Sequence, residues 1–97
     1  MITQDEFLAI ADSRPEMKRA FQAAVHATVV FRKEAAKNKR GILSQLRLRK
    51  RGFSAIFLTN RVLSGFIYDG QPASEQDKEL IRSWIVGAAE FEMDNSN

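Results

Sequence analysis

The chain has no cysteine and only one histidine among its 97 residues. Without cysteine it can form neither a disulfide nor a thiolate metal site. The lone histidine, His26, lies among alanine and valine, with no second histidine to complete a metal-ligand set or a partner to make it a base. Glycine-rich phosphate loops, dinucleotide fingerprints and nucleophile motifs are missing too. We therefore expect a protein without enzymatic activity, metal or cofactor.

Long apolar runs are also missing. The longest apolar stretch, around residues 53–68, is interrupted by Arg61 and is too short to span a bilayer. The N-terminus has neither the positive start nor the apolar run of a secretory signal. With 44% hydrophobic and 28% charged residues, the sequence is that of an ordinary globular protein, and its length predicts one domain over residues 1–97. We expect it to be cytoplasmic and to avoid membranes.

Acidic residues are scarce in the middle of the chain. Residues 31–52 contain nine lysines and arginines against Glu34 alone, whereas residues 72–97 contain six acidic residues against Lys78 and Arg82. The net charge of the whole chain is only +3. Such an uneven distribution predicts a polyanionic partner or the association of unlike ends of two chains.

Three segments are typical of helices. Thr3 and Glu6 form a capping box in front of a short helix that should end at Asp12. A second box introduces a longer helix over about residues 14–38, in which apolar residues recur at steps of three and four. A final helix is predicted over about residues 75–93, with acidic residues in its first turn, where the helix dipole favours them.

Residues 42–68 are predicted to form a three-stranded antiparallel meander, because apolar residues alternate with polar ones and glycine ends the first loop. Its three strands are expected at residues 42–49, 53–59 and 62–68. The loops between them are expected at residues 50–52 and 60–61. The predicted fold class is therefore α+β, in the order α-α-β-β-β-α. It comprises a helical part (1–41), the meander (42–68) and a C-terminal helix (73–94).

A competing interpretation makes residues 42–51 a short basic helix, since leucine, glutamine, arginine and lysine are good helix formers. The order helix, basic helix, hairpin would then suggest a winged-helix DNA-binding protein. We prefer the strand for two reasons. Leu48 would point away from the other apolar residues of such a helix, and no good N-cap precedes it.

One face of the predicted meander combines arginines with aromatic rings. Basic side chains can follow a nucleic-acid backbone while rings stack on its bases, as proteins that bind single strands do. Lysines and arginines at the first turn and at the end of the preceding helix would extend the phosphate track. The candidate binding residues are Lys37, Lys39, Arg40, Arg47, Arg49, Lys50, Arg51, Phe53 and Phe57.

The same sheet face has two other interpretations. It is either covered by one of the long helices or paired with a second chain in a homodimer, since exposed clusters of large apolar residues are unusual on a monomer.

The predicted function is that of a small non-enzymatic nucleic-acid-binding protein, a regulator or accessory factor. The alternative is a protein-interaction module or inhibitor that docks its basic region onto an acidic protein.

Overall fold

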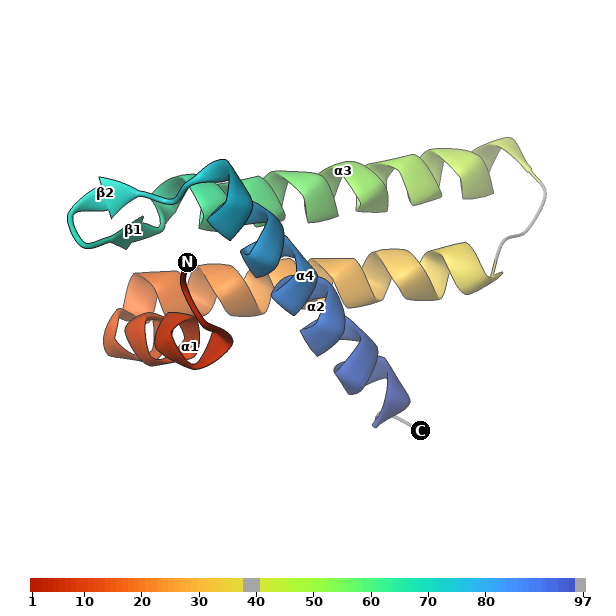
Figure 1. Ribbon diagram of the computed structural model, residues 1–97. Coiled ribbons are helices and arrows are strands. Elements are labelled where there is room, and N and C mark those ends of the chain that lie inside the picture. The colour runs from red at the N-terminus through yellow and green to blue at the C-terminus, as the bar shows by residue number, and fades with distance from the viewer. Residues whose placement is uncertain (38–40, 96–97) are drawn as a thin grey trace.

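The computed structural model describes residues 1–37 and 41–95, which form four helices and one short β-hairpin (Figure 1). The first two helices are α1 (Gln4–Ser13) and α2 (Pro15–Lys37). The capping box in front of α1 is formed, because the Glu6 amide donates to Thr3 Oγ1 and the Thr3 amide donates to Glu6 Oε1, each at 3.2 Å. Both helices agree with the sequence prediction to within one or two residues at their ends.

The predicted meander is wrong. Residues Ile42–Gly65 form a single helix of 24 residues, α3, which runs antiparallel beside α2 (Figure 1). Within the described part of the chain, extended strand is confined to β1 (Ile67–Tyr68) and β2 (Gln71–Pro72). The observed order is therefore α-α-α-β-β-α, and the fold is mostly helical instead of α+β. Both loops predicted inside the meander lie within α3.

The winged-helix alternative also differs from the structure. It placed a helix over residues 42–51. The type of element is correct, but the predicted helix covers less than half of the 24 residues of α3. In a helix-turn-helix motif the two helices cross at about 90–120°, whereas α2 and α3 lie side by side as a long antiparallel pair (Figure 1).

α3 is helical because its inward positions follow a helical period. Leu48, Gly52, Ala55, Thr59 and Val62 recur at steps of three and four, and all are partly or fully buried. Residues with this spacing lie on one face of a helix. No side chain caps the start of α3 at Gly41, so packing along α2 must supply the stability that local capping does not.

The β-hairpin turns at Asp69 and Gly70. Both residues have positive φ, 54° and 76°, which is the requirement of the type I′ turn that Asp-Gly favours. Ile67 pairs with Pro72 across this turn. The hairpin reverses the chain and delivers it to the last helix.

That helix, α4 (Glu75–Asp94), begins as predicted at Ser74, whose hydroxyl oxygen accepts from the Asp77 amide at 3.1 Å. The Asp77 carboxylate accepts in turn from the backbone amide of Ile2 at 3.2 Å, which ties the start of α4 to the N-terminal segment. α4 then crosses α2 obliquely (Figure 1), and its far end is held to α2 by an ion pair between Arg32 and Glu90, at 3.1 Å.

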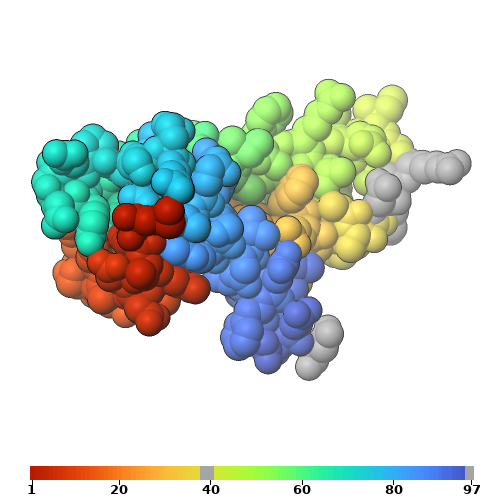
Figure 2. Space-filling view, viewed as in Figure 1, coloured from red at the N-terminus to blue at the C-terminus, as the bar shows by residue number. Residues whose placement is uncertain are grey.

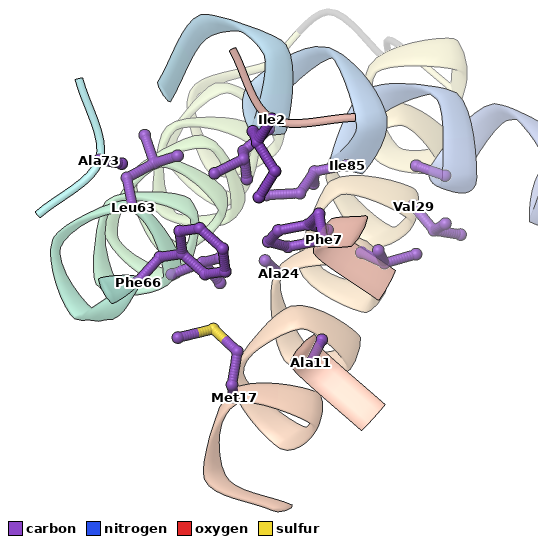
Figure 3. Packing of buried hydrophobic residues seen from close by; sticks show 14 residues of the cluster. Ile2, Phe7, Ala11, Met17, Ala24, Val29, Leu63, Phe66, Ala73 and Ile85 are labelled. Atoms are coloured by element: carbon purple, nitrogen blue, oxygen red, sulfur yellow. The ribbon is translucent and has the colours of Figure 1, made fainter. Parts of the chain in front are cut away.

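The hydrophobic core lies at one end of the α2–α3 pair, where α1, the hairpin and the start of α4 meet (Figure 3). The fully buried Phe7 is at its centre. The centroid of its ring lies 5.1 Å from that of Phe66, 5.5 Å from that of Phe21 and 5.5 Å from that of Trp84. These four rings join α1, α2, α4 and the residue that follows α3.

The other end of the α2–α3 pair extends away from this core. We call it the distal hairpin and define it as residues 31–37 of α2 with residues 42–57 of α3. It gives the molecule an elongated shape of 48 × 26 × 23 Å. Figure 2 shows this end projecting beyond α1 and α4. α4 leans across α2 and approaches α3 at Ala55 and Ile56, and Figure 1 shows the rest of the distal hairpin extending beyond α4.

Candidate functional site

The distal part of α3 exposes six large apolar side chains. Each has between 55% and 81% of its surface accessible to solvent. A folded monomer rarely leaves so many large apolar residues together in water without a role for them. We call this set the exposed α3 face; it consists of Ile42, Leu43, Leu46, Phe53, Ile56 and Phe57.

These residues point outward because the inward positions of the distal part are mostly small. Ser44, Gly52 and Ala55 face α2 and are partly buried. A Cβ atom placed on Gly52 would lie 3.1 Å from Cε1 of Phe31 on α2, so the two helices approach closely at this point. The small inward residues permit this approach, and the large residues of the segment are left on the outer surface.

The basic residues predicted for the site divide between two sides of α3. Arg49 lines a hollow with Ile42 and Leu46, next to the exposed α3 face. On a different side, Arg51 lines a groove between α2 and α3. Arg47 also turns toward α2, with its Nη1 atom 3.8 Å from Oε1 of Glu34. The arginines therefore do not share one face, as the meander had required.

Two further basic residues of the predicted set, Lys37 and Lys50, belong to the distal hairpin. Lys50 is exposed on α3, and Lys37 is the last residue of α2. Lys39 and Arg40 lie outside the described residues. α3 contains four arginines and one lysine between residues 42 and 65, and no acidic residue. Apart from Glu34, the surroundings of the exposed α3 face are therefore positive.

The aromatic platform predicted for the sheet does not form. Phe53 and Phe57 are exposed, but they lie four residues apart on a helix. Phe66 is buried against Phe7 in the core. The hydroxyl of Tyr68 donates a hydrogen bond to Oε2 of Glu6 at 2.6 Å, at the opposite end of the molecule.

The contact between Tyr68 and Glu6 changes the acidity of both groups. The hydrogen bond from Tyr68, and then those from Thr3, stabilise the carboxylate and lower the pKa of Glu6. The same bond to Glu6 favours the neutral phenol and raises the pKa of Tyr68. The hydrogen bond is exposed at the covered end of the fold, and the Tyr68 ring is half-buried against the core, so we assign the pair a structural role.

A hollow at the junction of α3 and α4 borders the exposed α3 face. Its volume is about 190 Å³, and Ile56 of the exposed α3 face forms part of its wall. Val86 and Ile85 of α4 and Thr28 of α2 form other parts of the wall. This hollow is large enough to receive one apolar side chain of a bound partner.

The described residues offer no site for metal chemistry, because no three His, Cys, Asp or Glu side chains among residues 1–37 and 41–95 gather closely enough to hold an ion. His26 is exposed on α2. None of the helices described is both long and apolar enough to cross a membrane.

Searches against protein families, curated proteins and solved structures found no match to this chain.

The sequence prediction included Phe53, Phe57 and the basic residues but missed the aliphatic members of the exposed α3 face. A helical period through residues 42–57 could have found them, because Leu46, Phe53 and Phe57 fall at steps of seven and four on one side of a helix. Because the searches found no match, the function is inferred from the exposed α3 face itself.

Proposed function

We propose that the protein is a non-enzymatic interaction module whose exposed α3 face binds an acidic, amphipathic helix of another protein. One observation carries the proposal: six large apolar side chains lie exposed on a helix that has five basic residues and no acidic one. Amphipathic helices dock through apolar residues at positions i, i+3, i+4 and i+7. The exposed α3 face offers the same period to such a partner.

Charge around the face selects the partner. Arg49 lies beside the apolar residues and Lys50 is exposed near them, so acidic residues on the rim of a partner helix would meet positive charge on docking. An apolar anchor of the partner would enter the hollow beside Ile56. Buried apolar contacts would provide affinity, and the charges would provide orientation and a faster encounter.

Nucleic-acid binding at this face is a second candidate. It is favoured by the basic residues of α3, among which only Arg47 has an acidic neighbour, at 3.8 Å. However, bases stack on aromatic rings, and only Phe53 and Phe57 of the exposed α3 face are aromatic. The four aliphatic residues suit a protein helix better. Homodimer formation and a cytoplasmic location stay predictions.

A display library of helical peptides can test the first candidate. The folded protein would be used for selection, and the binders would be counter-selected against the double variant Phe53→Ser/Phe57→Ser. We expect the enriched peptides to carry acidic residues beside an apolar stripe, and to bind the variant at least about tenfold more weakly, the loss expected when anchor residues are truncated. Both phenylalanines are exposed, so the variant should unfold at an unchanged temperature.

The matched control is Leu8→Ser, which removes an exposed apolar residue from α1 instead of α3. This variant should bind the selected peptides like the parent protein. Binders that tolerate the double variant would contradict the proposal, and so would a selection without acidic peptides. Binding of a single-stranded oligonucleotide that is lost in the double variant, with no peptide binding, would favour the second candidate.

A further inference from the structure

A groove runs between α2 and α3, and the residues that line it come from these helices and from Arg14 just before α2. Its larger part has a volume of about 690 Å³ and lies between the start of α2 and the end of α3. A smaller hollow of about 200 Å³ continues toward the distal hairpin, and Ala23 and Leu58 line both parts. Between Arg51 and Gly65, α3 follows the groove for roughly 21 Å, at 1.5 Å per residue.

Four arginines border this groove. Arg14, Arg19 and Arg61 line the larger part and Arg51 the smaller one. No ion pair found among the described residues involves any of the four. Arg14 donates one hydrogen bond, to the backbone carbonyl of Ile67 at 3.1 Å. Four guanidinium groups are thus held beside one groove without a carboxylate partner.

Only one carboxylate, that of Glu16, is found among the described residues that line the groove, and it leaves the balance strongly positive. α2 begins at Pro15, next to the larger part, so the positive end of the α2 dipole adds to the same field. The groove therefore attracts negatively charged ligands, and its shape indicates which class of such ligand fits it.

Small side chains form part of the floor of the groove, beside the larger apolar side chains of Met17, Val30 and Leu58. Ala20, Ala23 and Ala27 come from α2, and Ser54 comes from α3. A ligand backbone can approach such a floor closely. Among the described residues that line the groove, the imidazole of His26 is the one aromatic ring, so the groove offers the bases at most one small ring for stacking.

We propose that this groove binds the sugar–phosphate backbone of a single-stranded nucleic acid, independently of base sequence. The forked guanidinium group matches the geometry of phosphate. The larger part of the groove, about 690 Å³, has room for a stretch of a single chain. An acidic peptide is a weaker fit, because the alanine floor has no deep apolar pocket for an anchoring side chain.

The groove lies on a different side of α3 from the exposed α3 face. Arg51, Ser54, Leu58 and Arg61 follow each other at steps of three and four, and none of them belongs to the exposed α3 face. The two sites can therefore be tested separately, and each proposal can fail without the other.

The test measures fluorescence anisotropy of a labelled oligothymidylate of about 12 nucleotides between about 50 and 200 mM salt. The double variant Arg19→Ala/Arg61→Ala should bind at least about tenfold more weakly at the lower salt. It should also reduce the slope of log affinity against log salt by about 1.4, because each phosphate contact on a single strand contributes about 0.7. Both side chains are exposed, so the fold should be retained.

The charge-matched control is Lys18→Ala/Lys33→Ala, which removes two exposed positive charges that line neither the groove nor the exposed α3 face. Its affinity should change by less than about threefold, within a generic charge effect. A third variant, Ala23→Gln, keeps every charge but fills the floor, and it should also weaken binding. Equal losses in the two double variants would overturn the proposal. Undetectable binding at low salt, or equally strong competition by inorganic triphosphate or polyglutamate, would overturn it as well.

Discussion

The two ends of α3 contain similar residues but have different surroundings. Toward the C-terminus Val62 and Leu63 are buried, whereas in the distal hairpin Phe53 and Phe57 remain 70% and 68% exposed. At the buried end α1, the β-hairpin and the start of α4 all reach α3 or α2 (Figure 1), whereas the distal hairpin is approached by α4 at Arg32 and beside Ile56 and extends beyond it. The number of elements that reach a segment therefore decides whether its apolar residues become core or surface. The following predictions test this difference, from the largest expected effect to the smallest.

Truncating one phenylalanine in the core and one in the distal hairpin compares the two surroundings directly. Phe66→Ala should lower the free energy of unfolding by about 3–5 kcal/mol, because it leaves a cavity beside Phe7. Phe57→Ala should change it by no more than about 0.5 kcal/mol, as expected for an exposed position. Denaturant unfolding of both variants gives the comparison. Losses of similar size would mean that the distal hairpin is also covered in solution.

A side chain at Gly52 tests the close approach of the helices in the distal hairpin. Gly52→Val should lower the free energy of unfolding by about 1–3 kcal/mol, because its Cβ would lie 3.1 Å from the ring of Phe31. Gly87→Ala in α4 is the control. It meets no atom within 4 Å and should raise stability by about 0.5–1 kcal/mol through helix propensity alone. An unchanged or raised stability in Gly52→Val would show that the Phe31 ring moves aside easily.

The capping box of α1 tests how firmly the covered end is attached. Thr3→Ala removes the acceptor for the Glu6 amide and should lower the free energy of unfolding by about 1 kcal/mol. Ser13→Ala removes an exposed hydroxyl near the other end of α1 and should change it by less than about 0.5 kcal/mol. Thermal unfolding of the two variants measures this difference in stability. Equal effects would mean that the cap adds no more than an ordinary surface contact.

The Glu6–Tyr68 hydrogen bond predicts a small dependence of stability on pH. Because the pKa of Glu6 is lowered in the folded state, the bond stabilises the protein above the ordinary glutamate pKa of about 4.3 and is lost as pH falls through the folded value. Because the pKa of Tyr68 is raised, the stabilisation is present below about pH 10 and is lost as pH rises through the folded value.

Tyr68→Phe should therefore lower stability at neutral pH and converge with the parent protein at both extremes. The effect will be small because both groups are exposed. Unfolding measured over a series of pH values would show it. A stability difference that stays constant from acidic to alkaline pH would mean that the hydrogen bond contributes nothing in solution.

The elements that could be predicted from the sequence carry local stop and start residues. α1 and α4 begin at Thr3 and Ser74, whose hydroxyl groups cap the helix, and both were placed correctly. α3 has no side-chain cap and depends on α2 along its length. Its apolar residues fit both an alternating and a helical period, and the alternating one was chosen. The strongest hairpin dipeptide, Asp69-Gly70, follows the predicted meander directly, and it forms the one hairpin described in the structure.

The candidate sites were predictable to a smaller extent. Phe53 and Phe57 were predicted as binding residues because two aromatic residues stand beside a run of basic ones. Both are exposed in the structure, and their role in binding stays a prediction. The arginine groove could not be predicted, since Arg19 and Arg61 are far apart in the sequence. They meet only because α3 runs antiparallel to α2, and the sequence analysis had no helix at residue 61.

The order in which the elements pack has a kinetic consequence. α1, α2 and α3 are neighbours in the chain and pack on one another, so their contacts can form quickly, as in other helical proteins with mostly local contacts. α4 is different, because its start is held by an amide 75 residues earlier, that of Ile2. Docking of α4 closes the longest loop of the fold and carries the largest entropic cost of closure. We therefore expect α4 to dock last during folding and to detach first in transient opening, which amide hydrogen exchange would detect.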